Sequence, residues 1–195
     1  MVASAPIRQS RETPMRTAIT ILVLLPMIAW ADPPVRSGLD VGQRPGPYSS
    51  LVVVGSQRGT QHCFVCEAEN KPIVIVFART PSEPLGKLVR QLDGLMKKST
   101  ADLRGWTTFL AADAGPLEPK LVAWSQKHAT GGVPLTVFED VVGPPSYRLG
   151  ADADVTVLLS VNRKVAANFA FRAGELNEAA IAAIAEQAAK MSANK

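Results

Sequence analysis

Two cysteines, Cys63 and Cys66, are the residues of this sequence best suited to chemistry, and the chain has no others. A Cys-x-x-Cys pair can close a small disulfide ring, exchange that disulfide with another protein's thiols, or supply half of a metal site. A disulfide across so short a loop adds little to stability, because the entropic gain grows with loop length. The spacing therefore favours redox chemistry or a local effect on shape over simple stabilisation.

Four interpretations of the pair remain open. The first is a redox pair, in which protonated His62 lowers a thiol pKa while Glu67 and Glu69 oppose the thiolate. The second is a structural disulfide in a turn that joins two strands. The third is a metal site with His62 and His128 as further ligands, although no second cysteine pair completes a set of four. The fourth is a pair of free, unreactive thiols.

No other motif in the sequence indicates a cofactor or a second kind of active site. The sequence has no glycine-rich phosphate loop and no His-Glu-x-x-His zinc motif, and we predict neither a cofactor nor a bound metal. Ser125 and His128 lie three residues apart in a predicted helix, but no nucleophile-elbow motif frames them. We interpret both as surface polar residues.

The first 31 residues have the pattern of an export signal. Arg8, Arg11 and Arg16 precede an uncharged apolar run over residues 17–31, which ends in the small-x-small sequence Ala-Trp-Ala. The run is short for a membrane span, which needs about 20 apolar residues, so we expect cleavage and a membrane association only if the signal is retained. The protein is then exported, periplasmic or extracellular, where the compartment is oxidising and a disulfide persists.

The charge of the mature chain argues against nucleic-acid binding. Removing the signal takes three arginines and one glutamate from the 21 basic and 17 acidic residues and leaves 164 residues with a net charge of +2. No basic stripe interleaved with aromatic residues remains, so we expect no nucleic-acid partner. A chain of this length suits one domain, and the sequence predicts nothing about its oligomeric state.

The remaining sequence alternates between buried strands and amphipathic helices. A proline- and glycine-rich lead-in, predicted to pack little, covers residues 32–47, and a domain follows over residues 48–191. Continuous apolar runs predict buried strands at 73–78 and 106–112, and helical periodicity predicts helices at 82–98, 117–129 and 175–191. Further extended segments lie at 51–54 and 133–138, and the spacing over 155–171 is that of a β-hairpin. This order predicts a parallel sheet core with an antiparallel hairpin at one edge.

The chain resembles the thioredoxin-like superfamily, and more closely its redoxin branch of peroxiredoxin and cytochrome-maturation proteins. The strand KPIVIVFAR at residues 71–79 is similar to the strand that leads into the active site of that family, and residues 155–174 are similar to its closing hairpin. The resemblance implies an α/β fold, a three-layer α/β/α sandwich with a central mixed sheet, a closing hairpin and a C-terminal helix. It also implies thiol–disulfide exchange with protein thiols or disulfides, in which Cys63, the first cysteine of the pair, attacks.

Two features of the sequence depart from the family pattern. The family's reactive cysteine follows the strand at a helix N-terminus, but residues 79–84 (RTPSEP) contain no cysteine, and the pair lies upstream of the strand instead. The family's cis-proline position corresponds to Asp154, and Pro134 reads as an ordinary strand opening. We therefore expect little peroxidase activity, and a non-catalytic binding or scaffold module with a structural disulfide is the alternative to an oxidoreductase.

Overall fold

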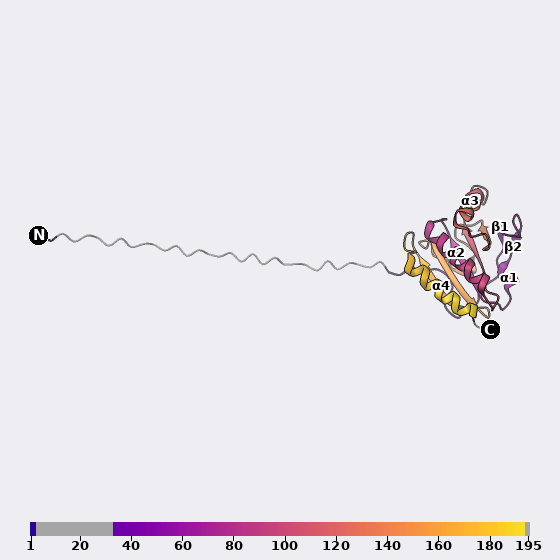
Figure 1. Cartoon of the computed structure of the whole chain (residues 1–195). Helices are drawn as coiled ribbons and strands as arrows, with labels where there is room; N and C mark the ends of the chain where they lie inside the picture. Colours follow the sequence, from indigo (N-terminus) through magenta and orange to yellow (C-terminus); the bar gives the residue numbers. More distant parts are fainter. Residues whose placement is uncertain (3–32, 194–195) are drawn as a thin grey trace. The chain divides into compact units, whose positions relative to one another are not determined.

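The computed structural model describes residues 1–2 and 33–193, and its compact unit begins at Pro34 (Figure 1). The predicted export signal therefore lies outside the described residues, apart from its first two. The elements follow one another as β1 (Ser50–Val54), β2 (Gln61–His62), α1 (Phe64–Ala68), β3 (Ile73–Ala78), α2 (Glu83–Lys98), β4 (Arg104–Leu110), α3 (Glu118–His128), β5 (Leu135–Phe138), a 3-10 turn (Pro145–Tyr147), β6 (Val155–Val161), β7 (Lys164–Phe171) and α4 (Glu178–Ala193). None of the described helices is long and apolar enough to cross a membrane.

The strands form one mixed sheet in the order β2-β1-β5-β4-β3-β6-β7. Strands β3, β4 and β5 are parallel, as the alternation of strands and helices predicts, whereas β1 and the hairpin β6–β7 run antiparallel to their neighbours. In the register of β3 and β4, Ile73 pairs with Arg104 and Ala78 pairs with Phe109. The two strands therefore begin at one edge of the sheet, called here the N-terminal edge, and end at the opposite C-terminal edge.

The predicted elements form for the reasons that the sequence suggests. All six residues of β3 are buried, because the strand is central and covered on both faces. Ser82 caps α2, since its hydroxyl accepts the backbone N–H of Leu85, and Lys97 and Lys98 occupy the last turn, where cations are favourable. Asn162 and Arg163 both have positive φ, which suits the two-residue turn of the hairpin β6–β7.

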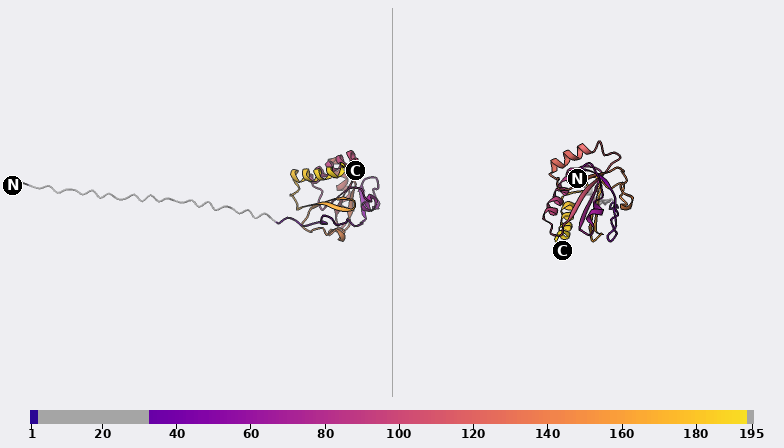
Figure 2. Two further views of the ribbon diagram at one scale, coloured as in Figure 1. Left: turned by 90° about the horizontal axis from the view of Figure 1, so that it is seen from below. Right: turned by 90° about the vertical axis from the view of Figure 1, so that its right-hand side faces the viewer.

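The sheet separates two apolar clusters, and the layers on its two faces differ in kind (Figure 2). Helices α2, α3 and α4 pack on one face around residues such as Leu88, Leu121 and Ile184. On the other face, the cluster contains Leu39, Tyr48, Ile75, Phe77, Trp106, Tyr147 and Leu158. The second outer layer is thus built from the lead-in, α1 and the loop before β6, with no long helix among its described residues.

The expectation that the lead-in packs little was wrong. Ser37 and Leu39 are buried, the Ser37 hydroxyl lies 2.6 Å from that of Thr156, and the Asn168 side-chain amide donates to the carbonyls of residues 37 and 39. The reason is topological, because the crossovers β3–α2–β4 and β4–α3–β5 both place their helices on the same face of the sheet. The apolar side chains on the other face must therefore be covered by other segments. A segment rich in proline and glycine supplies it without regular secondary structure.

Candidate functional site

Cys63 and Cys66 form a disulfide at the N-terminal edge of the sheet, just before β3 begins. Cys63 is the N-cap residue of α1, and the backbone N–H of Cys66 donates to Cys63 Sγ at 3.3 Å. Cys66 is exposed, whereas Cys63 is partly buried. The disulfide therefore lies at the surface of the domain.

The two residues between the cysteines attach α1 to the body of the domain. The ring of Phe64 stacks on the buried ring of Trp106 in β4, with centroids 5.4 Å apart, and Val65 packs against the same apolar cluster. The indole N–H of Trp106 donates to the Tyr48 hydroxyl at 2.7 Å, and that hydroxyl shares a hydrogen bond with Thr108. Burial raises the pKa of Tyr48 well above its ordinary value, so the hydroxyl stays neutral.

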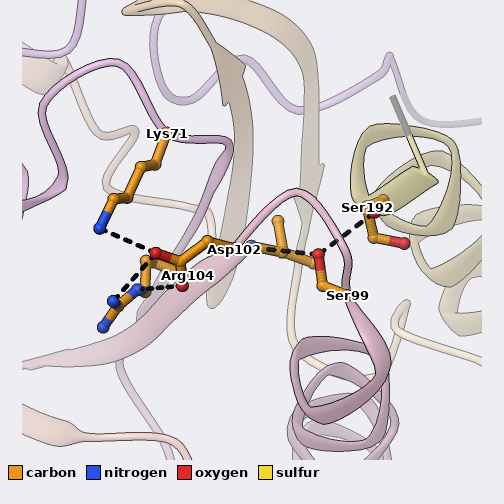
Figure 3. Close-up of polar contacts among 6 residues, drawn as sticks. Lys71, Ser99, Asp102, Arg104 and Ser192 are labelled. Carbon is orange, nitrogen blue, oxygen red and sulfur yellow. Dashed lines mark hydrogen bonds and ion pairs between the residues drawn. The ribbon is translucent and has the colours of Figure 1, made fainter. Parts of the chain in front are cut away.

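Several charged side chains lie on the same edge of the sheet as the disulfide. His62 Nε2 lies 2.8 Å from Glu67 Oε2, so the histidine that precedes Cys63 is already paired. Asp102 accepts hydrogen bonds from Arg104 and pairs with Lys71 at 2.8 Å (Figure 3), and these two cations hold the pKa of its carboxyl below its usual range. Asp102 has a φ of 54°, a left-handed conformation that aspartate tolerates better than most residues.

Two clefts open at the N-terminal edge, one on each side of Asp102. One of about 500 Å³ lies between α1, the end of α2 and the start of β4, and Phe64, Glu67 and Arg104 are among its lining residues. The other, of about 650 Å³, lies between the hairpin β6–β7 and the end of α4. The Ser99 hydroxyl donates to the Ser192 carbonyl (Figure 3), and the Thr100 hydroxyl donates to the same carbonyl, so the loop of Asp102 is tied to α4. The disulfide therefore stands beside concave surface.

The C-terminal edge, where the redoxin pattern places its cysteine, is occupied by other contacts. Ser82 holds the cap position of α2, and its carbonyl accepts the indole N–H of Trp124. The guanidinium of Arg79 donates to the backbone carbonyls of Ala153, Gly150 and Val141. Arg79 thus joins the end of β3 to the loop before β6.

The proposed correspondence between Asp154 and the family's cis-proline position fits the backbone contacts. The Asp154 carbonyl accepts the N–H of Arg79, and its own N–H donates to the carbonyl of Phe171. The position therefore faces the end of β3, opposite residues 79–84. No cis peptide bond occurs among the described residues, and Pro134 is trans.

The interpretation of Ser125 and His128 as surface residues was wrong. Both are buried, because the end of α3 packs against the start of α2, where the His128 ring occupies the space that a side chain on Gly86 would fill. His128 also contacts Trp124, at 5.1 Å between ring centroids, and lies 3.6 Å from Glu83. Within residues 1–2 and 33–193, no group of three histidine, cysteine or acidic side chains is placed to hold a metal ion.

The short helix α1 and the two-residue strand β2 are the parts of the site that the sequence did not predict. Five helical residues contain too few turns to show a 3.6-residue period, so a motif search finds the cysteines but not the helix that carries them. Cysteine is not one of the residues that favour the N-cap position, so the cap at Cys63 gave no signal in the sequence either.

Comparison with known proteins identifies the fold. Neither models of known protein families nor curated proteins match this sequence. Among solved structures, the chain is similar to a proposed protein disulfide isomerase from Bacteroides thetaiotaomicron, with a TM-score of 0.60 and 16% identity over 80% of this chain and 92% of that chain. It is also similar to a proposed thiol:disulfide interchange protein DsbE from Chlorobium tepidum (TM-score 0.56, 16% identity, 78% and 98% covered). The peroxidoxin BcpB from Mycobacterium tuberculosis gives a TM-score of 0.53 at 14% identity (78% and 97% covered).

These neighbours confirm the predicted fold class. The chain has the thioredoxin-like α/β fold found in redoxins, with a mixed seven-stranded sheet, a closing hairpin and a C-terminal helix. At identities this low the likeness concerns the fold alone, and a fold can carry many activities. What the protein does must therefore be inferred from its own residues.

Proposed function

We propose that this protein is a thiol–disulfide oxidoreductase that exchanges its Cys63–Cys66 bond with protein thiols or disulfides. The observation that carries this proposal is the surface position of the disulfide, with Cys66 exposed and the pair carried on a short helix beside a cleft of about 500 Å³. A thiolate attacks a disulfide only where it can reach one of the sulfurs, and a neighbouring second thiol then resolves the mixed disulfide.

The surroundings of the pair support exchange over stabilisation. The ring closed by the disulfide spans a sequence separation of three, so it constrains the unfolded chain little. The stacking of Phe64 on Trp106 attaches the helix α1 to the sheet by a contact that does not involve the disulfide. The similar structures include proteins described as disulfide isomerase and interchange proteins, which agrees with this chemistry.

The test is disulfide exchange by the purified mature chain. Wild type should catalyse the reduction of insulin by dithiothreitol, and the Cys63→Ser/Cys66→Ser double variant should not. The reduction potential should fall in the oxidoreductase range, between about −270 and −120 mV, whereas a structural bridge lies below about −300 mV. Equal, near-zero activity in both proteins together with a potential below that limit would refute the proposal.

Near-zero activity in both proteins together with a potential below about −300 mV would support the other candidate, a non-catalytic binding or scaffold module. One observation favours it: Arg79 and Ser82 occupy the C-terminal edge, where the redoxin pattern has its cysteine, and both side chains serve the fold. The same observation leads us to expect little peroxide reduction. Fast peroxide turnover that requires Cys63 would show that the chemistry is of another kind.

We further propose that the protein works outside the inner membrane, where the oxidising compartment maintains the disulfide. The pattern over residues 1–31 supports export. Cell fractionation with sequencing of the mature N-terminus checks this, with Asp32 expected as the first residue. A mature protein found in the cytosol with Met1 retained would contradict it.

A further inference from the structure

We infer that Cys66, the second cysteine, forms the mixed disulfide with the substrate, and that Cys63 is the leaving and resolving sulfur. This inference rests on the proposed exchange activity and assigns a role to each sulfur within it. It reverses the order that the redoxin resemblance implies, in which the first cysteine attacks. The reversal follows from the way the helix α1 is attached to the domain.

The first observation is the difference in exposure between the two cysteine residues. Successive residues of a helix are turned by about 100°, so Phe64 and Ala68 share one face of α1 and Cys66 lies nearly opposite. Phe64 stacks on Trp106 and Ala68 is buried, which fixes that face against the sheet and leaves Cys66 exposed. Cys63 is partly buried at the junction of β2 and α1. A substrate sulfur therefore meets Cys66 first.

The second observation concerns the sulfur that must leave. The backbone N–H of Cys66 donates to Cys63 Sγ at 3.3 Å, and the same donor can stabilise that sulfur when it becomes a thiolate. Cys66 has no hydrogen bond of this kind among the described contacts, and the carboxylate of Glu67 follows it directly in the helix. A better-stabilised thiolate leaves faster, so breakage of the bond toward Cys63 is favoured.

The exchange step then balances without any further reactant. The substrate thiolate donates its electron pair to Cys66 Sγ, a new S–S bond forms, and the Cys63–Cys66 bond breaks with its electron pair remaining on Cys63. In the second step, another substrate thiolate attacks the substrate sulfur of the mixed disulfide and releases Cys66, or Cys63 attacks Cys66 and expels the substrate. The first outcome oxidises the substrate dithiol and reduces the protein by two electrons.

Glutathione tests the assignment on the wild-type protein, where no variant can misfold. The oxidised mature chain is mixed with reduced glutathione and quenched after short times with N-ethylmaleimide. The tryptic peptide over residues 59–79, which contains both cysteines because trypsin does not cleave between Lys71 and Pro72, is then sequenced by tandem mass spectrometry. We expect glutathione on Cys66 and maleimide on Cys63. The opposite labelling, or equal labelling of both positions at the earliest times, would overturn the assignment.

Single variants provide the kinetic measurement. Cys63→Ser retains only Cys66, Cys66→Ser retains only Cys63, and each is reacted with glutathione disulfide over a range of pH. On the alkaline plateau, where both thiols are ionised, Cys66 should react about tenfold faster because it is the more accessible. If the plateau rate of Cys66→Ser equals or exceeds that of Cys63→Ser, the assignment of roles to the two sulfurs is refuted, but the proposed exchange activity is not.

The same data separate this assignment from the proposed function. If wild type forms no mixed disulfide with glutathione, and both single variants react no faster than they do when unfolded in urea, the exchange activity fails and the assignment fails with it. If a mixed disulfide forms readily but on Cys63, the activity stands and only the order of the two sulfurs is wrong.

Discussion

The two edges of the sheet differ in what their residues do, and only one edge carries the cysteine pair. At the C-terminal edge, the residues after β3 are held by hydrogen bonds that serve the fold, through Arg79 and the cap residue Ser82. At the N-terminal edge, an accessible disulfide stands beside a cleft and several charged side chains. The six residues of β3 separate the edges by about 17–20 Å, at about 3.3 Å per residue.

The two ends of the parallel strands thus carry different groups in this protein. A helix N-terminus that could stabilise a thiolate is present at α2, but no sulfur lies there. The sulfurs are instead carried at α1, a five-residue helix whose Phe64 stacks on Trp106 and whose Ala68 is buried. Substitutions at the C-terminal edge should therefore change stability without changing exchange, whereas those at the N-terminal edge act on the segment that carries the disulfide.

The largest expected effect is at the C-terminal edge. Arg79→Met removes a guanidinium that donates to three backbone carbonyls, two of them in part-buried surroundings, and should lower the free energy of unfolding by about 2–3 kcal/mol. Urea denaturation measures this loss. The rate of insulin reduction by the folded variant should stay at the wild-type value.

Arg79→Lys is the matched control, because it keeps the charge but cannot reach three acceptors at once. Its stability should lie between those of wild type and Arg79→Met. A clear fall in exchange by folded Arg79→Met would mean that the C-terminal edge takes part in the chemistry, and the contrast between the edges would then fail.

The second effect is at the N-terminal edge. Phe64→Ala removes the ring that stacks on Trp106, and since Phe64 is only partly buried, we expect a loss of about 1–2 kcal/mol, below the cost of a fully buried ring. Amide hydrogen exchange in α1 should become faster. Urea denaturation and hydrogen-exchange mass spectrometry together measure both consequences.

Val65→Ala is the control inside the same Cys-x-x-Cys pair, because Val65 contacts the cluster without stacking on an aromatic ring. It should cost less than Phe64→Ala and leave hydrogen exchange in α1 near the wild-type rate. If the two variants behave alike, the disulfide and not Phe64 holds α1 in place, and the bond would then have a structural role.

The smallest effect concerns Asp102, whose side chain is 53% exposed. Asp102→Asn keeps a residue that tolerates the left-handed backbone but removes the pairs with Arg104 and Lys71, and it should lower stability by less than about 1 kcal/mol at neutral pH. Because folding lowers the pKa of this carboxyl, its contribution is present above the ordinary aspartate pKa and disappears as the pH falls through the lowered folded value.

The difference in stability between wild type and Asp102→Asn should therefore shrink on acidification, and urea denaturation at several pH values checks it. High salt should reduce the difference at neutral pH, since the pairs are exposed. A difference that is constant down to the lowest pH at which the protein folds would show that Asp102 acts through its backbone conformation and not through its charge.

The local pattern of the sequence predicted most regular elements, for reasons that lie within each segment. The apolar run at residues 73–78, the periodicity of residues 83–98 and the spacing of the hairpin at 155–171 reflect burial and turn formation, which short stretches of sequence encode. The same local view missed α1, which is too short to show a period. It also misjudged the lead-in and His128, whose burial depends on segments far away in the chain.

The sequence by itself determined that two thiols lie three positions apart, that they precede the first parallel strand, and that no cysteine follows that strand. Only the tertiary structure decided which of the two cysteines is exposed. The exposure depends on the stacking of Phe64 on the ring of Trp106, which lies about 40 residues later in the chain. It also decided that Arg79 serves the fold, since its three acceptors come from loops brought to the end of β3 by strand pairing. The sequence sets which side chains are present and how far apart they lie along the chain. Long-range packing sets which of these side chains other molecules can reach.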